Sequence, residues 1–349
     1  MKRHLLTVVQ VAVTVGLLWW IFRDQEQNAA MLSALKVAHT GWLIPGLAAL
    51  GGGLLLQAQR WKILLQVQGI AISYMRSLRI LMVGMFFNLF LLGATGGDII
   101  KIFLIMREAP DKKAAALLSV FIDRVVGVLA LAAVSTVVIL LRWNDLMSHE
   151  VTRYGVATAA VILSGSIGFI AVAWITGRFE LTRKLPHWLP AREKIIEAAA
   201  AFLEYARAGK SVGAAFLLSI PAHLLMFSTF WFGAKAFSAG LNLLSIYCVM
   251  PIVATVTALP ISIGGAGLRE GLFIKILGSL YNTPESIATL VSLSGFILVV
   301  FWSLVGGVIY LLYRSTQHVT TPLADIEKTV EDLELRVEHN LEEGRRPEA

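Results

Sequence analysis

Charged residues are scarce in this sequence. Only 15% of its 349 residues are Asp, Glu, Lys or Arg, while 57% are hydrophobic. A soluble domain of this length carries more charge, because polar groups must cover its surface. The composition excludes a soluble globular protein and predicts a chain that lies mostly in lipid. The formal net charge of +7 then indicates Lys and Arg in cytoplasmic loops and beside anionic lipid headgroups. We therefore expect no nucleic-acid partner.

Cysteine is nearly absent. The single Cys248 lies in an apolar run, so neither an intrachain disulfide nor a cysteine zinc site can form. The histidines are scattered without an i, i+4 pair, which argues against a histidine metal site. Residues 33–36 have the S-x-x-K form without companion motifs, and residues 265–267 lack the preceding strand of a dinucleotide fold. We expect no metal, no cofactor and no enzymatic activity.

Long apolar runs dominate the rest of the chain, and most approach the roughly 20 residues that cross hydrocarbon. These runs are Leu5–Phe22, Trp42–Gln59, Leu78–Leu92, Ala114–Leu141, Tyr154–Thr176, Val212–Phe232, Leu241–Leu259 and Ile287–Tyr313. The first follows a basic N-terminus, as a signal peptide would. Because it is longer than a typical signal core and no convincing cleavage site follows, we predict an uncleaved first span.

Two runs end in glycine-rich breaks. Leu78–Leu92 leads into residues 93–98 and a short helical stretch, Ile99–Arg107; Leu241–Leu259 leads into residues 260–267 and another, Leu268–Leu277. If the first broken segment crossed the membrane, the basic residues 107, 112 and 113 would lie outside, against the positive-inside rule. The rule holds along the whole chain only if both segments turn back at their glycines.

The predicted fold class is therefore an all-α polytopic membrane protein with six full spans plus two glycine-broken re-entrant helical hairpins in an inverted-topology repeat. Residues 1–314 form the transmembrane domain, with halves of about 1–142 and 150–314, and both termini are cytoplasmic. Unwound backbone at membrane depth must be buried in protein or line a wet cavity. The two hairpins should therefore meet at a cavity near the midplane.

Two peripheral segments are predicted beside the spans. Ala191–Arg207 has one apolar face and should lie on the cytoplasmic leaflet. Residues 315–349 form an acidic cytoplasmic tail with a short heptad stripe, which fits a docking or surface helix as well as a helix that makes a homo-oligomer.

Charged residues gather near the two breaks and inside one run. A charge at the bilayer centre costs roughly 2.5–3.5 kcal/mol, so these residues need partners or water. The half-helices begin at the glycines, where free N–H groups and the positive dipole end suit an anion. The predicted substrate-binding residues are Asp98, Lys101, Asp123, Arg124, Arg269, Glu270, Asn88, Gly96, Gly97, Gly264, Gly265 and Gly267.

Structural roles for the same residues stay open. Asp123 and Arg124 could sit near the cytoplasmic end of their span, where the arginine reaches the interface. Asp98 and Lys101, one turn apart, could pin the first hairpin. Asn88 fits a hydrogen bond between packed helices, and the glycines fit close helix packing.

Three stretches resemble one family. They are Asn88–Asp98 (NLFLLGATGGD), Ile122–Gly127 (IDRVVG) and Pro260–Glu270 (PISIGGAGLRE), and they are similar to the flippase-like transmembrane domain related to bacterial lysylphosphatidylglycerol synthetase/flippases. The resemblance covers roughly residues 5–314 and implies lipid translocation across the inner membrane. Full-length synthetases carry a separate soluble domain that aminoacylates the lipid from a charged transfer RNA; we expect no such domain here, so synthase activity is not implied.

The sequence departs from the family pattern at two positions. Leu92 stands where members often have proline, and Lys101 stands where they often have arginine. Lysine can hold a phosphate as a point charge but not bidentately.

We expect an inner-membrane transporter that moves an anionic or zwitterionic phospholipid, or a lipid-linked headgroup, between leaflets. Arg269, Lys101 and Arg124 would hold the phosphate, while Glu270 and Asp98 would balance charge, bind a cationic headgroup or carry a coupling proton. The alternatives are a membrane-embedded lipid-modifying transferase and a non-catalytic partner that delivers lipid to a separate enzyme.

Overall fold

The protein is built from helices. The computed structural model describes residues 2–90, 96–178, 200, 202–257 and 262–316, and no strand occurs within those ranges. The predicted all-α class is therefore confirmed. The tail beyond residue 316 and most of the stretch predicted to lie on the cytoplasmic leaflet fall outside the described residues.

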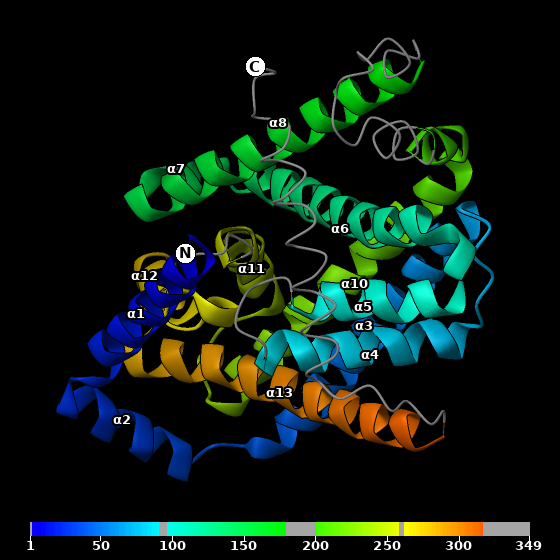
Figure 1. Ribbon diagram of the computed structural model, residues 1–349. Coiled ribbons are helices and arrows are strands. Elements are labelled where there is room, and N and C mark those ends of the chain that lie inside the picture. Colours follow the sequence, from blue (N-terminus) through cyan, green and yellow to red (C-terminus); the bar gives the residue numbers. More distant parts are fainter. Residues whose placement is uncertain (1, 91–95, 179–199, 201, 258–261, 317–349) are drawn as a thin grey trace, which may run out of the picture.

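Each apolar run of the sequence falls on a helix (Figure 1). The helices are α1 Lys2–Phe22, α2 Gln25–Lys36, α3 Leu43–Val67, α4 Tyr74–Phe90, α5 Gly96–Glu108, α6 Lys113–Leu141, α7 Trp143–Ser148, α8 Glu150–Arg178, α10 Gly209–Ala236, α11 Leu243–Thr257, α12 Leu268–Tyr281 and α13 Glu285–Thr316. Short 3₁₀ turns cover Thr40–Trp42, Pro110–Lys112 and Ile263–Gly265. Helix α2 was not predicted, because it is short and polar on most of its surface.

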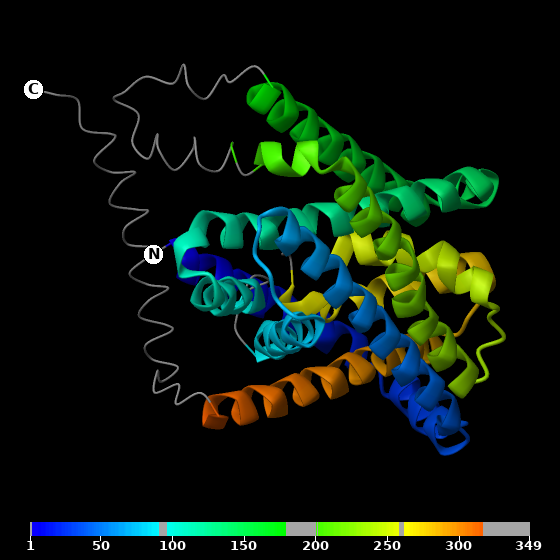
Figure 2. The same ribbon diagram turned by 90° about the vertical axis from the view of Figure 1, so that its right-hand side faces the viewer.

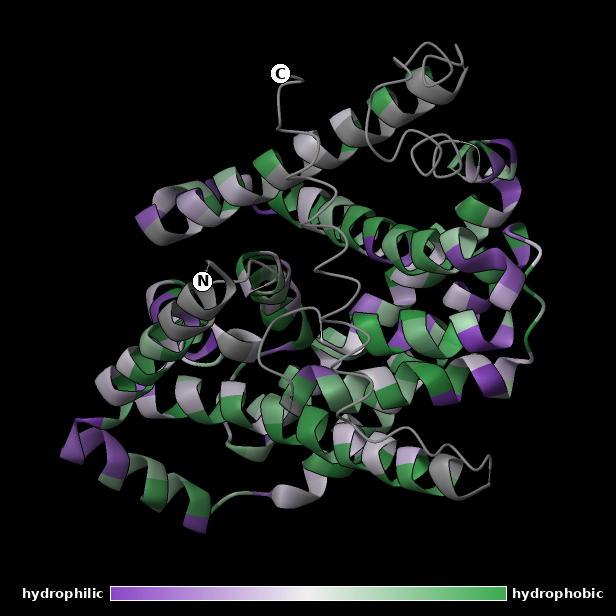
Figure 3. Ribbon diagram, viewed as in Figure 1, coloured by the Kyte–Doolittle hydropathy of each residue, from purple (hydrophilic) through white to green (hydrophobic). Residues whose placement is uncertain are grey.

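Several helices are long and apolar enough to cross a membrane. Within the described residues, four helices meet this description, namely Thr40–Val67, Pro110–Leu141, Gly209–Ala236 and Glu285–Leu312, and shorter apolar helices cover Gln10–Phe22 and Leu243–Thr257. Figure 3 shows hydrophobic residues along α6 and α13 and hydrophilic ones at the right-hand ends of α4, α5 and α6. The chain is a multi-pass membrane protein.

Helices α3 and α10 pack against each other and run side by side (Figure 2). Small residues allow this close approach: a Cβ on Gly53 would lie 3.2 Å from the carbonyl oxygen of Ala222. Helix α13 packs along α4 in the same way, and a Cβ on Gly306 would lie 2.1 Å from the Met82 carbonyl oxygen. Close packing at small residues is the usual basis of helix association in lipid.

Helices α4 and α5 form an antiparallel hairpin. Arg76, near the start of α4, forms an ion pair with Glu108 at the end of α5, while Asn88 near the end of α4 contacts Gly97 at the start of α5. The loop that enters this hairpin lies beside the turn that leaves it, since Lys112 Nζ donates to the carbonyl oxygen of Gly69 at 3.0 Å. Both lie on the right of Figure 1.

Helices α11 and α12 also pack against each other, and a Cβ on Gly265 would lie 3.2 Å from Thr257 at the end of α11. The turn from α12 to α13 lies on the left of Figure 1, at the opposite end of the molecule from the loops around the α4–α5 hairpin. The first hairpin therefore begins and ends at one end of the molecule, and the second begins and ends at the opposite end.

Candidate functional site

Asp123 is the centre of a buried charge network. Its Oδ1 accepts a hydrogen bond from Arg60 Nε at 2.7 Å, and its Oδ2 lies 3.4 Å from Lys101 Nζ. Arg60 Nη1 also donates to Ser219 Oγ at 3.2 Å. The network therefore joins α3, α5, α6 and α10. The side chains of Arg60 and Asp123 are 7% and 4% exposed, so these charges depend on bonds within the protein rather than on bulk water.

Arg60 is the charged member of this network that sequence reasoning missed. The predicted second span ended at Gln59, which placed Arg60 in a cytoplasmic loop. In the structure α3 continues to Val67, because Trp61, Leu64 and Leu65 extend its apolar face and are fully buried. Apolar residues one, four and five positions after Arg60 indicate that the helix continues past it. This pattern could have identified Arg60 as part of the helix.

The side chain of Lys101, on α5 of the first hairpin, is buried against α4 and α3. Its Nζ lies 4.5 Å from the centroid of the Trp61 ring, a distance at which a cation is attracted to the ring face. Its aliphatic chain passes Gly84 of α4, where a Cβ would lie 2.7 Å from Lys101 Cγ. Its partner is Asp123 of α6 rather than the neighbouring Asp98, so the two charges of α5 do not pin the hairpin by pairing with each other.

Asp98 pairs with Arg124 of α6. Arg124 Nε donates to Asp98 Oδ2 at 2.8 Å, and Arg124 Nη2 donates to Asp98 Oδ1 at 3.0 Å. This two-point geometry is the one in which a guanidinium also grips a phosphate. The Arg124 side chain is 54% exposed, although its partner is only 15% exposed. The pair thus lies beside the network around Asp123, because Arg124 follows Asp123 in α6.

Arg124 lies well inside α6. Arg124 is far from either end of this 29-residue helix; at 1.5 Å per residue it lies roughly 16 Å from the first residue, about half the hydrocarbon thickness. Leu117 and Phe121, on the same face, are exposed apolar side chains. Arg124 is therefore a charge in the middle part of α6 with apolar neighbours, and it does not lie at either end of that helix.

Asn88 and the glycines of the first break hold the hairpin together. Asn88 Oδ1 accepts a hydrogen bond from the Gly97 N–H at 2.8 Å, as the helix-packing interpretation predicts. A Cβ on Gly97 would lie 2.0 Å from the Gly84 carbonyl oxygen, so only glycine fits there, and the adjacent Gly96 is buried too. One N–H of the α5 N-terminus is thus already occupied by a side chain of α4.

Glu270 is the buried charge of the second hairpin. Its Oε1 accepts hydrogen bonds from Arg269 Nη2 at 2.7 Å and from Ser292 Oγ of α13 at 2.8 Å. Its Oε2 accepts the Gly267 N–H at 2.7 Å, which caps the N-terminus of α12. The Arg269 guanidinium carbon lies 4.8 Å from the centroid of the Phe296 ring. Both charges are therefore satisfied within the second hairpin and α13.

The second glycine break needs glycine for conformational reasons. Gly264, Gly265 and Gly267 have φ values of 58°, 75° and 78°, which other residues adopt rarely. A Cβ on Gly267 would also lie 2.5 Å from Leu17 of α1. Helix α1 therefore packs directly over this break.

The predicted site residues fall into two groups. The first group holds two neighbouring sets of ion pairs, Lys101 and Asp123 with Arg60 in one and Asp98 with Arg124 in the other, on α3, α5 and α6. In the second group, Arg269 and Glu270 bond within α12 and to α13. No such bond between described residues joins the two groups. The structure adds three partners that the sequence did not suggest, Arg60, Ser219 and Ser292.

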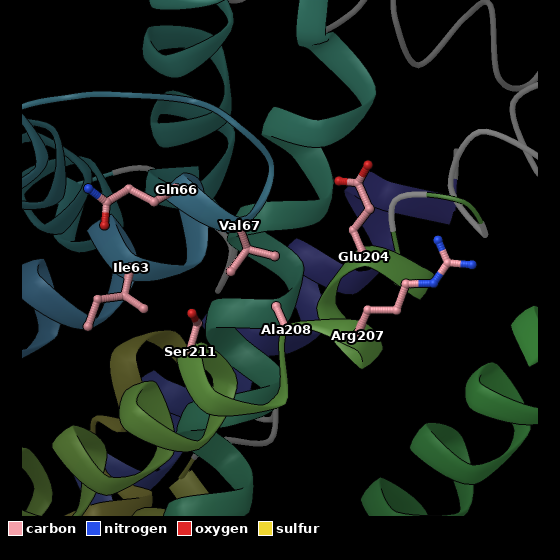
Figure 4. Close-up of a pocket in the computed structure, with 7 residues that line it drawn as sticks. All are labelled: Ile63, Gln66, Val67, Glu204, Arg207, Ala208 and Ser211. Carbon is pink, nitrogen blue, oxygen red and sulfur yellow. The ribbon is translucent and has the colours of Figure 1, made fainter.

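A surface hollow lies elsewhere, at the end of α3 and the start of α10 (Figure 4). It has a volume of about 410 Å³, and none of the predicted site residues lines it. The lining residues are Ile63, Gln66, Val67, Glu204, Arg207, Ala208 and Ser211. Nearby, the Tyr205 hydroxyl donates to the Leu64 carbonyl oxygen at 3.1 Å, so residues 202–207 are attached to α3.

Comparison with known proteins identifies one family. The family described as "Lysylphosphatidylglycerol synthase TM region" matches residues 7–307, a range that contains every charged and glycine residue discussed above. Among curated proteins none matches the chain. Because the family match spans most of the sequence, the protein belongs to the family of the lysylphosphatidylglycerol synthase transmembrane region.

Proposed function

We propose that the protein moves phospholipid headgroups between the two leaflets of the bacterial inner membrane, without chemical change to the lipid. The observation that carries the proposal is the exposed Arg124–Asp98 pair near the middle of α6. A charge at that depth costs roughly 2.5–3.5 kcal/mol when it faces hydrocarbon. An exposed guanidinium there is tolerable if it faces water or a headgroup, and its apolar neighbours Leu117 and Phe121 suit the acyl chains of the same lipid.

The network around Asp123 supports a phosphate at this place. Arg60 and Lys101 lie behind the Asp98–Arg124 pair, on the protein side, and add positive charge that hydrocarbon does not screen. Arg124 would grip the phosphate bidentately, and Lys101 would act on it as a point charge. We leave Arg269 out of the proposed phosphate site, because its guanidinium is bonded to Glu270 and Ser292.

The two hairpins support an inverted repeat. Each is a helix, a glycine break and a second helix that returns along the first, and they start from opposite ends of the molecule. On this proposal both hairpins are re-entrant in the membrane, and α1, α3, α6, α8, α10 and α13 are the six full spans. Transporters of this architecture bind substrate where the broken helices approach the midplane.

Topology gives a direct test of the repeat. Single cysteines at positions 107 and 112, in a Cys248→Ala background, should resist an impermeant thiol reagent added to whole cells, because a hairpin returns them to the cytoplasmic side. A cysteine at position 145, in the turn between α6 and α8, should be labelled. Labelling at position 112 from outside would contradict both the re-entrant first hairpin and the repeat.

Reconstitution tests the transport itself. Purified protein in liposomes should accelerate the loss of fluorescent phosphatidylglycerol from the outer leaflet, relative to empty liposomes, and Arg124→Ala should slow that loss several-fold. Lipid extracted afterwards should be unchanged. A new lipid species would instead indicate a lipid-modifying transferase, and a normal leaflet distribution with unchanged lipid would indicate a delivery partner.

A further inference from the structure

Helix α2 joins α1 to α3 and carries an apolar surface that the other described residues leave uncovered. Met31 of this helix is buried, whereas Leu32 and Leu35 are 61% and 48% exposed. Val37, which directly follows the helix, is 76% exposed. A single exposed apolar side chain is ordinary, but three within six residues of a short connecting segment indicate a contact surface. We call Leu32, Leu35 and Val37 the α2 surface.

Three hydrogen bonds fix the position of α2 in the molecule. Asn28 Nδ2 donates to the carbonyl oxygen of Phe22, the last residue of α1, at 2.7 Å. Gln27 Nε2 donates to Thr289 Oγ1, near the start of α13, at 3.5 Å. After the helix, the His39 N–H donates to the carbonyl oxygen of the last residue of α10 at 2.8 Å. Because α10 and α13 are long and apolar enough to cross a membrane, α2 lies where membrane-crossing helices end.

Tryptophans mark both junctions of α2 with its neighbours. Trp19 and Trp20 lie near the end of α1, Trp42 directly precedes α3, and all three are exposed. Tryptophan is enriched at the level of the lipid headgroups, where one side of its ring is apolar and the other is wet. Residues 23–39 contain two basic and two acidic residues, so this segment has no charge excess that would favour a charged partner.

We propose that α2 is an interfacial helix that docks on the lipid surface, with the α2 surface at the boundary between headgroups and acyl chains. Helices of this kind place their apolar side chains roughly 5–10 Å into that boundary. Ser33 is exposed and lies two residues from Leu35, nearly on the opposite side of the helix, so it faces water. Through Asn28 and Phe22, the same contact ties α1, which packs over the second glycine break, to the membrane surface.

Site-specific fluorescence tests this contact without any measurement of lipid movement. Leu32→Cys, Leu35→Cys and Ser33→Cys are made singly in the full-length Cys248→Ala protein, labelled with an environment-sensitive thiol fluorophore, and placed at one copy per phosphatidylcholine nanodisc. Aqueous iodide should quench the labels at 32 and 35 several-fold less than the label at 33. A lipid quencher near the headgroup should quench 32 and 35 more strongly than one near the chain end.

Three results would overturn the proposal. Equal iodide quenching at all three positions would show that lipid does not cover the α2 surface, and a second copy cannot cover it because each disc holds one. Stronger quenching by the chain-end quencher would show that α2 is inserted deeply rather than at the boundary. Protection that appears only when phosphatidylglycerol is added would show that charge, and not apolar contact, holds the helix.

Two matched charge variants test which face of α2 meets the lipid. Leu32→Glu should increase iodide quenching of the label at 35, because a carboxylate on the α2 surface opposes burial in the boundary. Ser33→Glu places the same charge on the watery side and should leave that quenching unchanged. An equal increase in both variants would mean that α2 has no lipid-facing side, which contradicts the proposal.

Discussion

Replacing Asp123 with Ala is expected to destabilise the protein by about 3–5 kcal/mol, the usual cost of removing one partner from a buried ion pair. The carboxylate serves two cations at once, Arg60 at 2.7 Å and Lys101 at 3.4 Å. Both would remain buried without an acceptor of opposite charge. Thermal unfolding in a mild detergent should show a markedly lower midpoint, and the yield of folded protein should fall.

A second change distinguishes charge from packing. Adding Arg60→Met to Asp123→Ala removes one of the two uncompensated cations and keeps much of the apolar volume, so part of the lost stability should return. Asp145→Ala, which breaks an exposed pair with Arg142, should change the midpoint little. A double variant no more stable than Asp123→Ala would show that the network does not depend on its charges.

The helices could be predicted because the bilayer requires long apolar runs, and because the glycines at 264, 265 and 267 mark a break that only their backbone conformations permit. The end of α3 could not be placed in this way. A charged residue normally marks the end of a span, but Arg60 is stabilised inside the protein by Asp123, 63 residues later in the chain. The sequence around Arg60 therefore does not reveal the partner that stabilises it inside the helix.

The charged residues predicted near the first break are bonded in the structure, but not in the pairs that their spacing suggested. Spacing along α5 suggested that Asp98 and Lys101 act together, since they are one turn apart. Each instead bonds across to α6, Asp98 to Arg124 and Lys101 to Asp123. Two adjacent residues of α6 thus bond two residues of α5 that are one turn apart. Which residues form pairs depends on how the two helices pack, and spacing within one helix cannot reveal that.

Arg269→Ala should also destabilise the protein, because Glu270 is 1% exposed and would lose its only ion-pair partner among the described residues. The loss should be smaller than for Asp123→Ala. Ser292 Oγ and the Gly267 N–H still donate to the Glu270 carboxylate, so part of its hydrogen bonding survives. Lys275→Ala, on the exposed side of the same helix, is the matched control and should unfold at the wild-type temperature.

The double variant Arg269→Ala, Glu270→Ala decides what this pair does. Removing both charges leaves no buried carboxylate without a cation, so the midpoint of thermal unfolding should rise again above that of Arg269→Ala. We expect the double variant to keep moving fluorescent phosphatidylglycerol in liposomes, because Arg269 is directed to Glu270, Ser292 and the Phe296 ring rather than to an accessible site. A stable double variant that no longer moves lipid would instead assign Arg269 to the phosphate. Both hairpins, and not only the first, would then contribute a guanidinium to the transported headgroup.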